Sequence, residues 1–298
     1  MQELDVQQQF DPRVAAIDVG AMSYAEMDQR HMNEALDRMG AMLGWAASGR
    51  GPLGQVIKAG AKVVIKPNFV MHENSGPGGM PPLLTHQSLV QAATRAALLA
   101  NPAEVMIGDA PIQGCDFDLL LKNAELDDWS RTLQIQDSRF KGIRDFRRTV
   151  ATFVDGVRIA EENVQPEDRF VLFDLGAESL LEPITDDNPS FRVTCYDPRL
   201  MAKTHAPGCH RYLIAREILE ADVVVNPGLD YRTARGRSVD IAVALGYRGR
   251  HSLLNRLGRS RPCDAAFLLP PSLQLRGDMF NSAQGIHPAT GHPFAALG

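Results

Sequence analysis

The chain has 298 residues, of which 44% are hydrophobic, and it carries 31 lysine and arginine side chains against 36 aspartate and glutamate side chains. This length can bury a sizeable core in one large domain or two modest ones. No stretch approaches the roughly 18 to 20 apolar residues of a membrane-spanning helix. Residues 1–13 are polar, unlike a secretory signal. The sequence therefore disfavours a membrane or exported protein.

The cysteines are scattered singly and form no CxxC pair; they are Cys115, Cys195, Cys209 and Cys263. This spacing disfavours a ferredoxin-like cluster or a local zinc knuckle, and a disulfide scaffold is unusual in a chain of this size. We therefore expect isolated buried thiols and no iron–sulfur cluster within this chain. The pattern identifies no other cofactor.

Charge divides the chain into two parts. Residues 1–227 carry 22 basic and 32 acidic side chains, whereas residues 228–298 carry 9 basic and 4 acidic ones and contain neither lysine nor glutamate. We interpret 1–227 as an α/β core domain and 228–298 as a basic, atypical C-terminal segment. Its arginines are spread out without interleaved aromatic residues, so nucleic-acid binding is not expected.

Within residues 1–227, short apolar runs alternate with amphipathic stretches, which is typical of an α/β fold. The expected strands lie at 14–17, 61–65, 104–107, 169–175 and 221–226. The expected helices lie at 24–45, 85–101, 117–124 and 212–219, with a further helix at 238–245. These elements predict a mainly parallel sheet with helices on both faces, followed by a poorly defined C-terminal tail.

Polar residues follow three of the expected strands directly. Lys66 and Asn68 follow the strand at 61–65, Asp109 follows the strand at 104–107, and Asn226 ends the last one. In open parallel sheets the ligand crevice lies at the carboxyl ends of the strands, so we expect these side chains to converge there. Thr85 and His86 open the intervening helix, with Thr85 as the expected N-cap.

This set of side chains suits a small anionic ligand, with or without a divalent metal ion. Lys66 offers a compact positive charge, and Asp109 and His86 are candidates for a base or a metal ligand; these three are the candidate catalytic residues. Asn68, Thr85 and Asn226 are the candidate ligand-binding or cofactor-binding residues. Each residue also has a structural interpretation: a turn for Asp109, a surface cap for His86 and a solvated strand-end charge for Lys66.

Two other clusters have simpler interpretations. Asp116 and Asp118 are expected to cap and charge the first turn of the helix at 117–124. Residues 203–211, which include His205, Cys209 and His210, are expected to form a loop near the ligand crevice rather than a metal site. The chain contains no GxSxG or HExxH motif, and the glycine-rich loop at 76–79 lacks the spacing of a phosphate-binding motif.

Four segments together resemble an uncharacterised prokaryotic family known as domain of unknown function 362. They are Val-Val-Ile-Lys-Pro-Asn at 63–68, Thr-His-Gln-Ser-Leu-Val at 85–90, Ile-Gly-Asp-Ala-Pro at 107–111 and Leu-Glu-Ala-Asp-Val-Val-Val-Asn-Pro at 219–227. The resemblance covers roughly residues 14–227. It implies a cytoplasmic α/β protein and, because family members are often fused to iron–sulfur ferredoxin modules, a separate ferredoxin-type protein as a partner.

After residue 227 the chain departs from the family pattern. The family continues with a Lys-Leu-Lys-Thr-His segment, whereas this chain continues with Gly-Leu-Asp-Tyr-Arg. One hypothesis is ordinary divergence. The other is a slip of the reading frame near codon 228, which would explain the inverted charge and the loss of lysine and glutamate together.

Three functions follow from these observations. The leading prediction is an enzyme that binds a small anionic substrate at the carboxyl ends of the strands. The second is a redox accessory or binding protein that docks a separate iron–sulfur protein. The third is an inactive, truncated or frameshifted member of the family.

Overall fold

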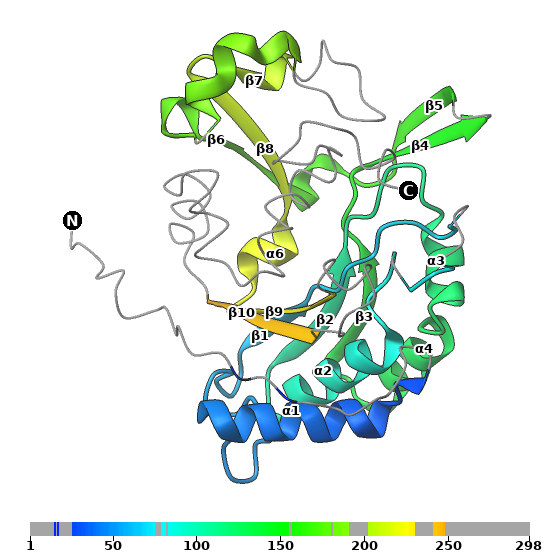
Figure 1. Ribbon diagram of the computed structural model, residues 1–298, viewed down its shortest axis with the longest axis vertical. Coiled ribbons are helices and arrows are strands. Elements are labelled where there is room, and N and C mark those ends of the chain that lie inside the picture. The colour runs from blue at the N-terminus through cyan, green and yellow to red at the C-terminus, as the bar shows by residue number, and fades with distance from the viewer. Residues whose placement is uncertain are drawn as a thin grey trace.

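The computed structural model describes residues 15, 17, 26–74, 79–81, 83–154, 157–179, 181–190, 202–229 and 241–247. The strand predicted at 14–17 lies mostly outside these residues, as does most of the tail after residue 229. Within the described part, a parallel sheet with flanking helices confirms the predicted α/β fold (Figure 1).

The main sheet has five strands in the order β10-β9-β1-β2-β3. The strands β1 (Lys62–Ile65), β2 (Glu104–Asp109), β3 (Phe140–Asp145) and β9 (Val223–Leu229) run parallel. Val63 in the central strand pairs with Val105 on one side and Val223 on the other. The fifth strand, β10 (Ile241–Tyr247), pairs antiparallel with β9 at the edge.

The predicted helix at 238–245 is therefore wrong. Ile241, Val243 and Leu245 are apolar residues spaced two apart, and two of them are β-branched. That pattern fits the pleat of a strand. Pairing of this segment with β9 places it in the sheet instead of on a helix.

Helices cover one face of the sheet, and a helix with a small second sheet covers the other (Figure 1). Val63 and Ile65 point toward the helical layer, which contains α1 (Gln29–Leu43), α2 (Gln87–Leu99) and α4 (Asp127–Gln136). Val64 points to the opposite face, where it packs near Ile218 of α6 (Arg216–Glu220). This alternation confirms that both faces of the sheet are buried, as a parallel sheet requires.

The second sheet packs against the first at one end and extends from there to the upper end of the molecule in Figure 1. It contains β6 (Phe170–Asp174), β8 (Cys209–Ala215) and β7 (His205–Ala206), all antiparallel, in the order β6-β8-β7. A 3₁₀ segment, η5 (Glu182–Ser190), packs against β7. A separate hairpin is formed by β4 (Thr149–Val154) and β5 (Val157–Asn163).

The second sheet confirms one sequence prediction and corrects another. The strand expected at 169–175 is β6, but the helix expected at 212–219 is a strand as far as Ala215 and becomes helical only in α6. Tyr212 and Ile214 are spaced two apart along β8, which is the period of a strand and not of one helix face. Pairing with β6 decides in favour of the strand.

The glycine before Asp109 permits the closest packing in the described sheet. A Cβ atom at Gly108 would overlap the tip of the Phe146 ring, and Phe146 N donates to Asp109 O over 2.8 Å. Only a residue without a side chain fits between this ring and the backbone of β2. The fold therefore requires glycine at this position.

We expect Gly108→Ala to lower the free energy of unfolding by about 1 to 3 kcal/mol, because the added methyl group overpacks the contact with Phe146. Urea denaturation measures the change. Combining it with Phe146→Leu, which removes the ring tip, should make the two changes less damaging together than the sum of the single changes. Strictly additive losses would contradict this account.

Candidate functional site

The structure brings Lys66 and Asp109 into direct contact at the carboxyl ends of β1 and β2. Lys66 Nζ lies 2.5 Å from Asp109 Oδ1, and the two side chains are 14% and 1% exposed. The backbone of Lys66 extends the sheet by one bond, since its N–H donates to Val225 O in β9 over 2.8 Å. The lysine backbone is thus fixed by one neighbouring strand and its side chain by the other.

Both oxygens of the Asp109 carboxylate accept hydrogen bonds. Phe69 N donates to Oδ2 over 2.7 Å, and Ala110 N donates to Oδ1 over 2.9 Å, in addition to the ion pair with Lys66. A buried carboxylate is costly unless it is surrounded by donors, and here three groups supply them. Asp109 therefore joins the segment after β1 to the end of β2, and it holds the Lys66 ammonium in place.

Thr85 connects the segments that follow β1 and β9 through hydrogen bonds between neutral groups. Its hydroxyl accepts from Asn68 N over 2.7 Å and donates to Pro227 O over 3.1 Å. Its own N–H donates to Asn68 O over 2.8 Å. Thr85, Asn68 and Asn226 are all buried. The predicted ligand-binding residues do converge, and Thr85 links the segments that follow β1 and β9.

Thr85 is not the N-cap of α2, as the sequence predicted; that position belongs to His86. His86 Nδ1 accepts from Ser88 N over 3.2 Å and lies 2.8 Å from Ser88 Oγ. Because Nδ1 accepts a backbone N–H, the neutral ring carries its proton on Nε2. Burial lowers the pKa of His86, against a smaller opposing effect of Glu125. His86 is thus a neutral ring and presents a donor on its far side.

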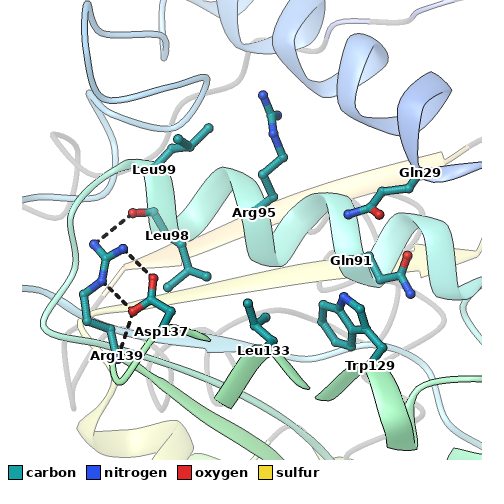
Figure 2. Close-up of a pocket in the computed structure, with 9 residues that line it drawn as sticks. All are labelled: Gln29, Gln91, Arg95, Leu98, Leu99, Trp129, Leu133, Asp137 and Arg139. Carbon is teal, nitrogen blue, oxygen red and sulfur yellow. Dashed lines mark hydrogen bonds and ion pairs between the residues drawn. The ribbon is translucent and has the colours of Figure 1, made fainter. Parts of the chain in front are cut away.

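Two clefts among the described residues lie elsewhere in the fold. One, of about 280 Å³, lies between α2 and α4 (Figure 2). Leu98 and Leu133 contribute to its apolar lining, and Arg139 closes one end through bonds to Asp137 and Leu98 O. Arg139 directly precedes β3, so this groove lies at the amino ends of the strands, opposite the Lys66–Asp109 pair.

The other cleft, of about 580 Å³, lies at the carboxyl end of β3 beside α3 (Phe117–Asn123). Asp116 lines it and caps α3 by accepting Leu119 N over 3.0 Å, which confirms the predicted capping role. Asp145, also in the lining, is held by Arg147, whose buried guanidinium donates to the carbonyl oxygens of Ile112 and Cys115. Neither cleft is lined by any of the six predicted site residues.

Residues 203–211 do not form a loop near the sheet edge, as expected from the sequence. They form the β7–β8 hairpin, with Gly208 at φ +71° in its turn. The positive φ is readily adopted by glycine and permits a tight turn between paired strands. Figure 1 shows β7 in the upper sheet, well separated from β1 and β2.

The hairpin places two histidines in the interior, a feature that the sequence analysis missed. His205 and His210 face each other across the strands, are both fully buried, and have their Nδ1 atoms 3.4 Å apart. His210 Nε2 lies 2.8 Å from Glu182 Oε2 and 3.2 Å from Thr185 Oγ1. Burial is the main cause that lowers the pKa of His205 to about 4, and the neighbouring His210 adds to it.

Of the cysteines, Cys115 matches the predicted isolated buried thiol. It is 5% exposed, and burial raises its pKa to about 12. A thiol with so high a pKa is not a nucleophile at neutral pH. Cys209 is partly exposed and points its sulfur toward Asp174. Cys195 and Cys263 lie outside the described residues.

Comparisons of this chain with protein-family models, with curated proteins and with solved structures find no match. The resemblance to domain of unknown function 362 therefore stays a prediction. Within the described ranges, no helix is long and apolar enough to cross a bilayer. The same ranges contain no group of three or more histidine, cysteine, aspartate or glutamate side chains placed to hold a metal ion.

We expect Asp109→Ala to lower the free energy of unfolding by about 3 to 5 kcal/mol, because it leaves the Lys66 ammonium and the Phe69 N–H without their acceptor. Urea denaturation provides the measurement. Asp128→Ala is the matched control: its carboxylate is 89% exposed, and its loss should change the free energy by no more than about 0.5 kcal/mol. Equal effects in both variants would refute the assignment.

Thr85 provides a second test of the sheet edge. Thr85→Val keeps the shape but leaves Asn68 N–H and Pro227 O without the hydroxyl, so we expect a loss of about 1 to 3 kcal/mol in unfolding free energy. Thr85→Ser keeps the hydroxyl and should lose clearly less. If thermal unfolding ranks the serine variant below the valine variant, the hydroxyl is not the group that matters.

Proposed function

We propose that this protein is an enzyme that binds a small anionic substrate at the carboxyl edge of its sheet, where Lys66 supplies the positive charge. The observation that carries the proposal is the position of that ammonium group. It follows the central strand β1 and is held by Asp109; the whole side chain is 14% exposed, and the Nζ atom itself is buried. A lysine fixed in this way at a strand end is already oriented toward a ligand at the crevice of an open parallel sheet.

The surrounding groups support an anion over a cation. The Asp109 charge is balanced by Lys66 and by two backbone N–H groups, so little of it remains to attract a cation. His86, next to the buried Thr85, has a lowered pKa and a neutral ring with its proton on Nε2, which can donate to an anionic oxygen. In this proposal Asp109 is a positioning residue for Lys66.

Because the chain as a whole is negatively charged, affinity for a small anion requires a local positive group. The chain has a formal net charge of −5, which repels small anions from the molecule as a whole. Any measurable affinity for a small anion must therefore come from a concentrated positive site. Lys66 is the positively charged group of the described sheet edge, and it is paired there with Asp109.

Calorimetric titration with inorganic phosphate and with succinate, two probes of different anion chemistry, tests the proposal. We expect the native chain to bind at least one of them, and Lys66→Met to weaken that binding by about tenfold or more, as for loss of one charge-assisted contact. Lys58→Met, at an exposed lysine, is the matched control and should bind normally.

Folding of each variant is checked by its thermal unfolding, because Lys66→Met also removes the partner of Asp109. Lys66→Arg keeps the charge and should retain more affinity than Lys66→Met at equal stability. The absence of binding to either probe by the native chain would overturn the proposal. An equal loss in Lys58→Met and Lys66→Met would show that only diffuse charge is involved.

A further inference from the structure

The contacts of the buried histidine pair in the β7–β8 hairpin determine which ring nitrogen of His210 carries a proton. Thr185 Oγ1 donates its hydroxyl proton to Leu181 O over 2.6 Å, so toward His210 Nε2, 3.2 Å away, that oxygen can only accept. Glu182 Oε2, 2.8 Å from the same nitrogen, also accepts. His210 Nε2 must therefore carry a proton.

This assignment determines which ring carries the proton that bridges the two Nδ1 atoms. In the neutral form His210 Nδ1 is a lone pair, so His205 Nδ1 must supply the proton that joins the rings over 3.4 Å. One added proton can be accommodated: it binds His205 Nε2, the proton on His205 Nδ1 moves to His210 Nδ1, and His210 becomes charged beside Glu182 while His205 Nδ1 accepts. A second added proton places N–H against N–H and two positive charges side by side in a fully buried space.

We propose that this pair makes the β7–β8 hairpin an acid-sensitive latch, which closes while the two rings share no more than one added proton and opens when both are protonated. The latch is short, because β7 has only two residues, His205 and Ala206, and each is paired with β8. Glu182 reinforces it, since both its carboxylate oxygens lie 3.0 Å from Gly208 N in the turn.

Charged and titratable groups of η5, β6 and β8 lie around the pair. Glu182 in η5 is bound to His210 Nε2, and Asp174 in β6 accepts His210 N over 2.9 Å. On β8, the Tyr212 ring lies edge-on to His205, while Cys209 and Arg211 contact Asp174 instead of the rings. Burial of both rings opposes the presence of two added protons.

The direction of the pH effect follows from the pKa of His205, which is lowered from 6.5 to about 4 in the closed hairpin. When the hairpin opens, His205 regains its ordinary pKa. Between pH 4 and pH 6.5 the open form therefore binds more protons than the closed form. Opening is therefore favoured as the pH falls from 6.5 toward 4, and closure is fully stable above 6.5. If opening fully restores the ordinary value, linkage predicts about a twentyfold rise in the opening equilibrium between pH 7 and pH 5.

Amide hydrogen exchange of the full chain, followed by mass spectrometry and corrected for intrinsic rates, tests the latch. We expect exchange in the segment 202–215 to rise by about ten- to thirtyfold from pH 7.5 to pH 5, while the β1 and β2 segments change little. His205→Asn offers an amide N–H in place of Nδ1–H but cannot titrate, so its acid-induced rise should be below about twofold. His31→Asn, at a partly exposed histidine on α1, is the control and should behave as the native chain.

Acid loosening that persists in His205→Asn, or that is missing from the native chain, would overturn the proposal. Nitrogen NMR of the histidine rings in the native chain gives an answer even where the His205→Asn variant fails to fold. It should show His210 with a protonated Nε2 and a His205 ring that takes up its proton only together with hairpin opening. A His205 ring that titrates near 6.5 while the hairpin stays closed would equally refute the latch.

Discussion

The buried carboxylate of Asp109 holds together the segments that leave the sheet after β1 and β2. One oxygen accepts from the Lys66 ammonium and from Ala110 N, and the other accepts from Phe69 N. Removal of such a charge from water is costly, and only a full set of donors offsets that cost. The paths of both segments are therefore set by the need to bring these donors to one carboxylate.

Several neighbouring features depend on that geometry. Phe146 N bonds to Asp109 O, which brings the Phe146 ring against Gly108 and leaves no room for a side chain there. Thr85 then joins the segment after β1 to the end of β9 with a single hydroxyl. The sheet edge is consequently a buried polar cluster, in which the Lys66 side chain is 14% exposed and that of Asp109 is 1% exposed. A ligand would meet a preorganised charge there and not a flexible side chain.

The sequence predicted the parts of this arrangement that depend on local pattern. The runs at 61–65, 104–107 and 221–226 are short, apolar and mostly β-branched, and they are the strands β1, β2 and β9. Convergence of Lys66, Asn68, Thr85, Asp109 and Asn226 followed from parallel strands having their carboxyl ends at one edge. The sequence analysis missed strand β3, because Phe140-Lys-Gly-Ile-Arg-Asp contains too few apolar residues to show the alternation typical of a strand.

The contacts themselves could not be predicted, because their partners are backbone groups or distant residues. Nothing in the side-chain pattern identifies Phe69 N and Ala110 N as the donors to Asp109. Glu182 is 28 residues from His210, and only the packing of η5 against the hairpin brings them together. Local spacing placed His205 and His210 in one cluster, but it carried no information about burial or about the sheet they would join.

The two polar clusters differ in how their bonds are satisfied. At the sheet edge, backbone N–H groups and a lysine surround Asp109, so the same bonds persist at every pH at which the lysine is charged and the carboxylate ionised. In the hairpin, the bond between the rings exists only while at least one Nδ1 lacks a proton. Strand β8 leads directly into α6, and Ile218 of α6 packs in the core beside Val64. Helix α6 therefore lies between the hairpin and β9 along the chain. In the proposed latch, this packing therefore separates the hairpin from the Lys66–Asp109 pair.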